Sequence, residues 1–327
     1  MIKLAIVSPC YNEEEVISHS VERLTQLFNE LTARKIISPK SCIVLVNDGS
    51  KDRTWQLICE AQQRNNRVRG INLTNNVGHQ NAIMAGMMTA KEWADAVITM
   101  DIDLQDDLNA IPEMIALHEE GKDVVYGVKT CRKADPLLKR YSAMAFYRLQ
   151  QAMGVKSVFN HADFRLMSKR ALNLLSQYGE RNLYLRGIIP QMGLPSATVQ
   201  DVISEREAGS SKYTISKMLG LALDGITSFS VKPIHLIIYM GMFSILLSLL
   251  CALYVLYSYI HHNAVPGWSS LMLSLWFLGG CVLLSIGVIG IYVGKIYIEV
   301  KNRPLYNISE MIGGQPSPAP SEEGKNQ

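Results

Sequence analysis

The sequence lacks charged residues from Pro233 through Gly294, although Lys, Arg, Asp and Glu are frequent before this segment. Within it, residues 234–260 and 268–294 are two uncharged, largely apolar stretches of 27 residues each. About 20 such residues suffice for a helix to cross the hydrocarbon core of a bilayer. A soluble domain would have to hide two such helices in its interior, which makes that alternative unfavourable. We therefore expect a two-helix transmembrane domain over residues 234–306.

Positive charge is also missing from the loop between the two expected spans, residues 261–267, whereas Lys232 and Lys295 flank the spans outside. Cytoplasmic loops of membrane proteins carry an excess of Lys and Arg. We therefore expect a multi-pass protein of the plasma or inner membrane with both termini in the cytoplasm. Residues 1–213 then form a cytoplasmic domain. Residues 214–233, with apolar side chains at helical spacing, form either a helix in the membrane interface or an ordinary packed helix.

Motifs that would indicate other kinds of site are absent. The six cysteines include no Cys-x-x-Cys pair, which favours free thiols in a reducing compartment over a zinc site or a disulfide framework. The net charge of +3 offers no broad basic surface for nucleic acid. No Gly-x-Gly-x-x-Gly follows the first apolar run, which disfavours a dinucleotide cofactor. The tail, residues 307–327, is rich in Pro and Ser from Gln315 onward, and we expect it to be disordered.

The first part of the chain does contain a regular alternation of apolar runs and amphipathic stretches. The pattern predicts strands at residues 4–9, 42–47, 68–73, 96–101 and 123–128 and helices at residues 13–33, 52–65, 80–91 and 109–120. Continuous Val, Ile and Leu runs are typical of strands buried on both faces. Strand–helix alternation therefore predicts an α/β fold with a mostly parallel sheet and helices on both sides. Ligands of such sheets bind beyond the carboxyl ends of the strands.

Two carboxylates lie at the end of the fourth predicted strand, Asp101 as its last residue and Asp103 two residues later. At the strand period of two, their side chains share a face. Two such carboxylates repel each other unless a cation lies between them, and Mg²⁺ or Mn²⁺ binds oxygen ligands together with substrate phosphates. We interpret the pair as a metal–diphosphate site, with a solvated acidic loop as the alternative. Asn47-Asp48-Gly49-Ser50, after the second predicted strand, is either an ordinary turn or part of the same site.

A turn of small residues lies shortly before the expected membrane helices. Arg206 and Lys212 flank Gly209, Ser210 and Ser211. The backbone N–H groups and hydroxyls of such a turn can hold an anion, and near a membrane surface the phosphate of a lipid is a suitable ligand. A flexible basic linker attracted to anionic head groups explains the same residues equally well.

Six short motifs occur in order along the chain: Pro9-x-Tyr11-Asn12-Glu13, Asn47-Asp48-Gly49-Ser50, Asn76-Val77-Gly78-His79, Asp101-x-Asp103-Leu104-Gln105-Asp106, Asp163-Phe164-Arg165-Leu166 and Arg206-x-x-Gly209-x-Ser211-Lys212. In this order, and with two C-terminal spans, they resemble the polyprenyl-phosphate glycosyltransferases of the inverting glycosyltransferase family 2. The segment from Ile296 to Pro304 is similar to the bacterial bactoprenol glucosyltransferases. The resemblance implies a nucleotide-sugar-binding domain of the GT-A type.

The resemblance also implies a role for each motif. The nucleotide pocket would be lined by Pro9, Tyr11, Glu13, Asp48 and Gly78, the metal on the donor diphosphate would be held by Asp101, Asp103 and Gln105, and phosphate would be bound by Arg206, Ser211 and Lys212. Asp163 falls on the catalytic carboxylate usually proposed as the base. One departure is Asp107-Leu108-Asn109, which replaces a proline-rich continuation and leaves the metal residues intact.

The reaction implied is transfer of a sugar, by default glucose from UDP-glucose, onto undecaprenyl (bactoprenol) phosphate at the cytoplasmic membrane face, for modification of cell-surface glycans. A lipid phosphate has a second pKa of about 6 and is largely ionised near neutral pH. We therefore expect Asp163 to orient the acceptor and Arg165 more than to remove a proton.

Two alternatives stay open. A processive polysaccharide synthase would need more spans and a Gln-x-x-Arg-Trp segment, which the chain lacks. The other is a non-catalytic membrane binding module that kept the fold. Glycines in the second expected span, residues 268–294, would allow close helix contacts in a homo-oligomer or with the first span.

Overall fold

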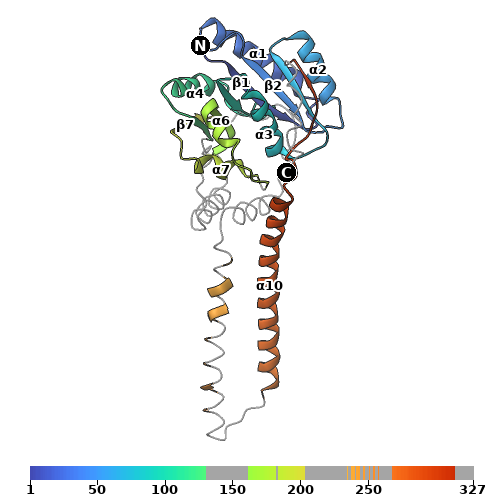
Figure 1. The fold of residues 1–327 in the computed structure, drawn as a ribbon, viewed down its shortest axis with the longest axis vertical. Coiled ribbons are helices and arrows are strands. Elements are labelled where there is room, and N and C mark those ends of the chain that lie inside the picture. The colour runs from blue at the N-terminus through green and yellow to red at the C-terminus, as the bar shows by residue number, and fades with distance from the viewer. Residues whose placement is uncertain are drawn as a thin grey trace, which may run out of the picture. The chain divides into compact units, whose positions relative to one another are not determined.

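The computed structural model describes residues 1–129, 161–181, 183–202 and 267–313, with scattered positions between 234 and 257. The chain divides into two units. One comprises Met1–Lys139, Val158–Lys212 and Pro304–Gln327, and the other comprises Arg140–Ser157 and Tyr213–Arg303. The first unit holds an eight-stranded sheet, and the second holds a long apolar helix (Figure 1).

The centre of the sheet is parallel and built from the first four strands. These are β1 (Leu4–Cys10), β2 (Cys42–Asn47), β3 (Val68–Leu73) and β4 (Ala96–Thr99). They pair in parallel in the order β4-β1-β2-β3. Every residue of β1, β2 and β4 is buried, as expected for strands covered on both faces. The α/β prediction from the apolar runs is confirmed.

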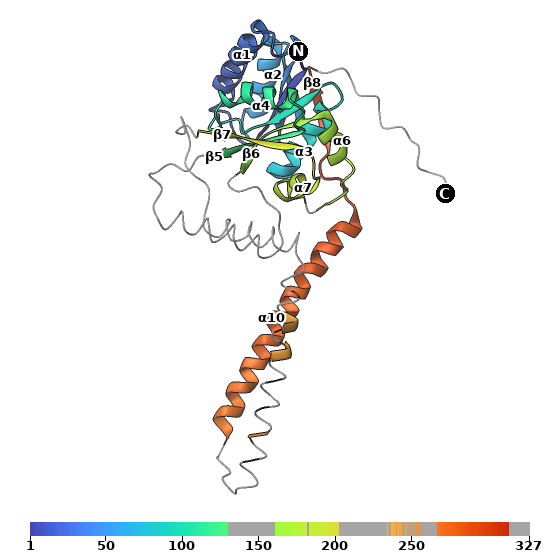
Figure 2. The same cartoon turned by 90° about the vertical axis from the view of Figure 1, so that its left-hand side faces the viewer.

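Helices cover both faces of this parallel centre. On one face, helices α1 (Ile17–Ala33), α2 (Thr54–Arg64) and α4 (Ala110–Glu119) share a core with alternate strand residues such as Leu4 and Ile6. On the other face lies α3 (His79–Ala90), which packs on β1, β2 and β4. Helix α3 can approach β1 closely because Gly86 has no side chain. A Cβ at Gly86 would lie 2.3 Å from the side chain of Val7 in β1. Figure 2 shows the helical layers edge-on.

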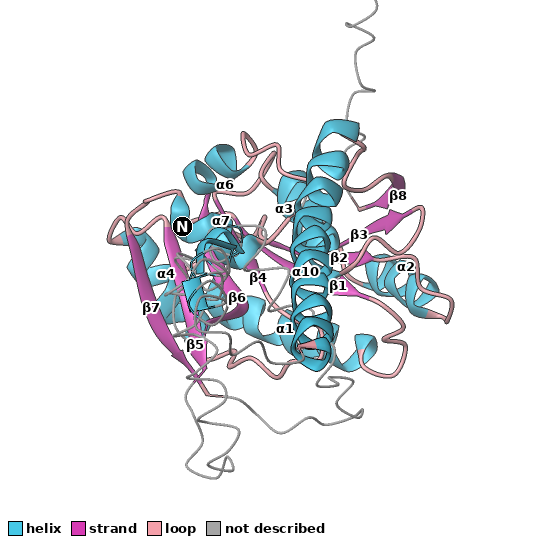
Figure 3. Ribbon diagram, turned by 90° about the horizontal axis from the view of Figure 1, so that it is seen from below, coloured by secondary structure: helices cyan, strands magenta, loops and turns pink. Residues whose placement is uncertain are grey.

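Beyond β4, the sheet continues with three more strands, one of which is antiparallel to its neighbours. Strand β6 (His161–Ser168) lies between β4 and β5 (Val124–Lys129) and is antiparallel to both, and β7 (Ser196–Asp201) adds to β5 in parallel (Figure 3). In this register Thr99 lies opposite Arg165. The start of β6 therefore lies at the carboxyl end of β4. Two short helices follow β6: α6 (Lys169–Leu175) and α7 (Leu185–Gln191).

The eighth strand, β8 (Ile308–Ile312), corrects the prediction of a disordered tail over residues 307–327. It pairs antiparallel with β3 at the edge of the sheet. The aliphatic side chain of Ile312 fills the space left by Gly70 on β3, so these few residues gain buried apolar contact that the Pro/Ser composition farther on does not offer. Residues 314–327 lie outside the described residues.

The second unit is represented by helix α10 (Trp268–Lys301), which contains the second predicted span and continues seven residues beyond it. At 1.5 Å per residue, its 34 residues measure about 51 Å. Its segment Phe277–Lys301 is long and apolar enough to cross a membrane, and it is the one helix of this kind within the described ranges. The predicted first span (234–260) and interfacial helix (214–233) fall largely or wholly outside them.

Candidate active site

Asp48, which follows β2, is held by the loop that leads into α3. Its carboxylate accepts hydrogen bonds from the backbone N–H groups of Val77 (2.7 Å) and Gly78 (3.1 Å). Burial raises the pKa of Asp48, and these hydrogen bonds oppose the rise. Gly78 has a φ of +89°, a backbone conformation natural to glycine. Two residues predicted to share the nucleotide pocket, Asp48 and Gly78, are therefore in direct contact.

The loop after β1 is tied to the turn after β2. The N–H of Asn12 donates to Ser50 Oγ (3.0 Å), and the N–H of Glu13 donates to Thr54 Oγ1 (2.9 Å). Gly49, in this turn, has a φ of +63°, and a Cβ there would lie 2.5 Å from the backbone nitrogen of Asn76. The N–H of Asp48 donates to the carbonyl oxygen of Cys10 (2.9 Å), the last residue of β1. Of the residues predicted to line the nucleotide pocket, Pro9 in β1 and Tyr11 in the loop after it therefore flank a residue bonded to Asp48, whereas Glu13 is bonded to Thr54 at the start of α2.

Asp101 and Asp103 lie in a loop, because β4 ends at Thr99, two residues earlier than predicted. The prediction that Asp101 and Asp103 share a face because of the strand period of two is therefore wrong, since neither residue lies in a strand. Leu104 turns the loop with a φ of +52°, and the N–H of Gln105 donates to Asp103 Oδ1 (3.3 Å). The two carboxylates still interact: burial raises the pKa of Asp101, and Asp163 and Asp103 raise it further, against the opposing effect of His79.

This donor set fits a divalent cation. The charge of Asp103 raises the pKa of Asp101, and a bound cation relieves such repulsion between like charges. Within the described parts of the chain, no group of three or more His, Cys, Asp and Glu side chains is arranged to hold a metal. A site with two carboxylates is nevertheless what Mg²⁺ uses when substrate phosphates supply the remaining ligands.

Asp163, near the start of β6, is surrounded by cationic side chains. Arg165 donates to its Oδ1 through Nη2. Arg186 of α7 donates through Nε to Oδ1 (3.3 Å) and through Nη2 to Oδ2 (2.9 Å). Burial alone would raise the pKa of Asp163, but hydrogen bonding to His79 and the charges of Arg186 and Arg165 hold it well below the usual range. These neighbours therefore favour the ionised form of Asp163 and make it a weak base.

His79, the first residue of α3, joins the two sides of the site. Its Nε2 lies 3.4 Å from Asp163 Oδ2 and 3.6 Å from Asp101 Oδ1. Burial would lower the pKa of His79, but the hydrogen bond to Asp163 and the charges of Asp101 and Asp163 raise it overall. The imidazole thus connects the carboxylate after β4 with the carboxylate on β6.

Comparison of the sequence with known proteins identifies the family of this chain. The sequence profile of glycosyl transferase family 2 matches residues 5–175. The chain belongs to glycosyl transferase family 2. An uncharacterized glycosyltransferase of Bacillus subtilis, YkoT, is 46% identical over 98% of this chain and 95% of its own length. The SfII prophage-derived bactoprenol glucosyl transferase of Shigella flexneri is 38% identical over 96% of this chain and 100% of its own.

A solved structure, the mannosyltransferase PcManGT from Pyrobaculum calidifontis in complex with GDP-Man and Mn²⁺, is a distant likeness. It is 16% identical, with a TM-score of 0.46 over 92% of this chain and 87% of its own. The family assignment rests on the sequence profile and the near full-length relatives, which make this protein an enzyme, a glycosyltransferase.

From the sequence alone, neither His79 nor Arg186 of the glycosyltransferase had an assigned role. His79 ends one of the quoted motifs, so the signal was present although its carboxylate partners were not evident. Arg186 carried no signal, because it reaches Asp163 from a helix 23 residues farther along the chain. The expected partnership of Asp163 with Arg165 is present in the structure. Arg206, Ser211 and Lys212 lie outside the described residues, so their phosphate-binding role stays a prediction.

A further acidic residue of the glycosyltransferase, Asp106, contacts the loop that carries Asp101 and Asp103. Its Oδ2 accepts a long hydrogen bond from the N–H of Asp101 (3.4 Å), and its Oδ1 lies 3.7 Å from Lys129 Nζ. Burial, followed by the charge of Asp101, raises the pKa of Asp106 to about 7. The position of Asp101 therefore depends on a carboxylate that titrates near neutral pH.

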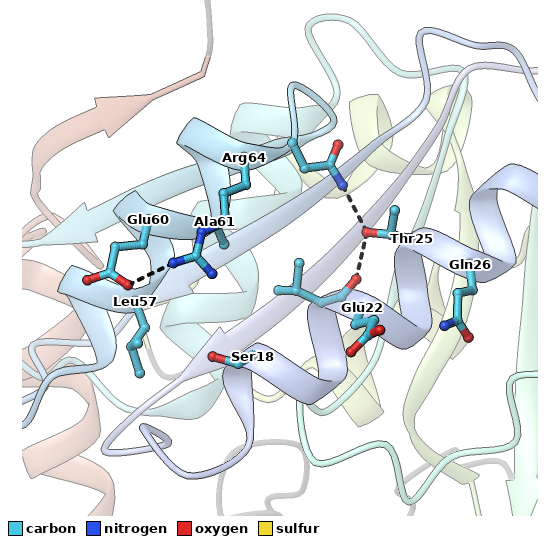
Figure 4. A pocket seen from close by; sticks show the side chains of 10 residues that line it. Ser18, Glu22, Thr25, Gln26, Leu57, Glu60, Ala61 and Arg64 are labelled. Atoms are coloured by element: carbon cyan, nitrogen blue, oxygen red, sulfur yellow. Dashed lines mark hydrogen bonds and ion pairs between the residues drawn. The ribbon is translucent and has the colours of Figure 1, made fainter.

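A groove of about 430 Å³ lies elsewhere on the glycosyltransferase domain, between α1 and α2 (Figure 4). Ser18, Glu22 and Thr25 of α1 face Leu57 and Arg64 of α2 across it. None of the carboxylates described above lines this groove, so it is separate from the candidate active site.

Proposed function

We propose that the enzyme transfers a sugar, with inversion, from a nucleotide-linked donor to the phosphate of a polyprenyl lipid at the cytoplasmic membrane face. The observation that carries the proposal is the cluster in which His79 connects Asp101 with the arginine-bound Asp163. The near full-length similarity to proteins named bactoprenol glucosyl transferase supports the acceptor class, and makes glucose from UDP-glucose the default donor.

On the donor side, the loops around Asp48 and Gly78, with Pro9, Tyr11 and Glu13, would bind the nucleotide. Asp101 and Asp103, with Gln105 on the same loop, would hold Mg²⁺ or Mn²⁺. The cation would offset the negative charge that develops on the departing nucleoside diphosphate. Asp106 and Lys129 would keep the loop of these ligands in place.

On the acceptor side, a phosphate oxygen attacks the anomeric carbon as the bond to the nucleoside diphosphate breaks. The phosphate needs no base, because its second pKa of about 6 leaves it largely ionised at neutral pH. Asp163 then serves to hold Arg165 and Arg186 in fixed positions, where their charge, the charges of Arg206 and Lys212 and the hydroxyl of Ser211 orient the anionic acceptor. In-line positioning of the two reactants would lower the barrier further.

The membrane segment would place this chemistry at the bilayer surface. Helix α10 is long and apolar enough to span, and the uncharged stretch 234–260 would be its partner. A membrane-anchored enzyme with both termini in the cytoplasm meets a polyprenyl phosphate where its head group is exposed. Association of α10 with a second copy through its glycines is a further expectation of this arrangement.

The test is a transfer assay on membranes that contain the protein. Radiolabelled UDP-glucose and undecaprenyl phosphate should give a lipid-linked sugar in the presence of Mg²⁺ or Mn²⁺, identified by mass spectrometry. Asp103→Ala should abolish transfer and metal-dependent donor binding without unfolding the protein. Glu22→Ala, an exposed carboxylate in the α1–α2 groove, is the matched control and should retain both. Sustained turnover of wild-type protein in chelator would contradict the proposal.

A further inference from the structure

The start of α3 contacts every part of the candidate site through consecutive residues. The N–H groups of Val77 and Gly78 bind Asp48 on the nucleotide side. His79 lies against Asp101 and Asp163. The next side chain, that of Gln80, accepts a hydrogen bond from the backbone N–H of Leu185 at 2.8 Å. The contacts of Val77, Gly78 and His79 involve groups already assigned to the donor and acceptor sides, whereas nothing yet explains the contact of Gln80.

The side chain of Gln80, on α3, caps the N-terminus of helix α7. The first N–H groups of a helix have no partner within it and are usually satisfied by a capping side chain. The N-cap residue of α7, Tyr184, makes no side-chain cap. Gln80, 105 residues earlier in the chain, supplies the acceptor instead. Because Leu185 is fully buried, its N–H would otherwise lose a hydrogen bond where water is scarce, which is costly.

The residue after Leu185 is Arg186, which binds both oxygens of Asp163. A side chain can be held accurately only when its own backbone is fixed, and α7 has only seven residues with which to fix itself. The hydrogen bond from Leu185 to Gln80 fixes the backbone next to Arg186. The same first turn of α3 carries His79, so Asp163 receives contacts from two residues that depend on a single helix start.

We propose that Gln80 is a positioning residue: through the N–H of Leu185 it sets the place of Arg186 on Asp163 and so couples the acceptor side to the donor side. The proposal rests on the assignment of Asp163 and Arg186 to the acceptor side. Gln80 then affects the rate of sugar transfer and leaves nucleotide affinity unchanged, because its bond lies on the acceptor side of α3. A displacement of about 1 Å at a reacting group can cost roughly 100-fold in rate.

The test compares three variants of the full-length protein in membranes or detergent. Gln80→Met removes the acceptor oxygen at nearly constant size, Gln80→Glu retains one, and Gln56→Met makes the same exchange on the exposed face of α2. Gln80→Met should lower kcat about 10- to 100-fold with the affinity for UDP and Mn²⁺ within twofold of wild type. Gln80→Glu and Gln56→Met should stay within about threefold of wild type in kcat.

Two further measurements separate this inference from the proposed function. Amide hydrogen exchange should rise at residues 183–188 in Gln80→Met and stay at the wild-type level in Gln80→Glu, whichever substrate the enzyme uses. In an Arg186→Lys background, Gln80→Met should cost less than about threefold, because residues that act through one contact are not additive. Three results would each overturn the inference. The first is amide exchange at residues 183–188 that is unchanged in Gln80→Met, and the second is a kcat as low in Gln80→Glu as in Gln80→Met. The third is a loss of kcat in the double variant equal to the product of the losses in the two single variants. Absence of any sugar transfer by wild type would instead contradict the proposed function.

Discussion

Replacing Asp163 with Asn tests whether this carboxylate is a base or an anchor. The structure favours an anchor, since Arg165, Arg186 and His79 all contact its oxygens and hold its pKa well below the ordinary value of 3.8. Asn has nearly the same shape and retains one oxygen acceptor. It removes the negative charge and leaves two guanidinium groups with an amide between them.

The free energies involved differ between a base and an anchor at Asp163. Moving a proton from a phosphate with a pKa of about 6 to a carboxylate with the ordinary pKa of 3.8 is uphill by about 2 pKa units, or about 3 kcal/mol. The depressed pKa makes this transfer still less favourable. Loss of the anchor leaves the fully buried Arg165 without its counter-charge, and breaking such a buried pair costs about 3–5 kcal/mol of stability.

The assay is the pH dependence of kcat/KM from pH 6 to 9.5, with thermal unfolding of both proteins measured alongside. We expect Asp163→Asn to be slower by roughly 100-fold at every pH, with a profile parallel to that of wild type, because the missing function is orientation. A base would show itself differently, since hydroxide could replace it. If the variant gains about tenfold per pH unit and approaches the wild-type rate at pH 9.5, Asp163 is a base and the reasoning is wrong.

Two other substitutions test parts of the site that the mechanism uses indirectly. Burial and Asp101 raise the pKa of Asp106 to about 7, so the folded state keeps a proton that the unfolded chain has released, and wild-type stability falls as pH rises from about 4 to about 7. Asp106→Asn cannot ionise, so its Tm relative to wild type should rise between pH 5 and pH 8 in chelator, by the equivalent of at most about 3 kcal/mol; a pH-independent difference would contradict this. Gly49→Ala should cost about 1–3 kcal/mol of stability and weaken UDP binding, because its φ is +63° and its Cβ would meet Asn76. Gly179→Ala, where a Cβ meets open space, is the control, and equal effects in denaturant titrations would count against the strain.

The parallel centre of the sheet could be predicted from the sequence because its signal is local. Runs such as Leu4–Cys10 and Cys42–Asn47 are mostly apolar and buried throughout, and the chain order of strands and helices fixes their direction. The carboxylates after β4 could be found for the same reason. Met100 and Asp101, at the start of the loop that leads to Asp103, were misjudged as strand, because the buried apolar Met100 continues the pattern after the last β4 pair at Thr99.

The remainder depends on contacts between distant parts of the chain. β8 is five residues long and follows a long apolar helix, and only the available edge of β3 makes a strand of it. The link between Arg186 and Asp163, and the one between Gln80 and Leu185, join helices and strands whose relative placement follows from the whole sheet. No periodicity in the sequence encodes such pairs.

The direction of β6 explains how the site divides its charge. Because β6 runs antiparallel to β4, Asp163 reaches the edge where Asp101 emerges, and both contact His79. The protein satisfies them unequally: two arginines bind Asp163 and lower its pKa, whereas burial and carboxylate neighbours raise the pKa of Asp101. Environments that push two pKa values apart mark different tasks. Under the proposed function, Arg165 and Arg186 would supply the cations of the acceptor side, and the side that would bind an anionic diphosphate would need a cation brought to it.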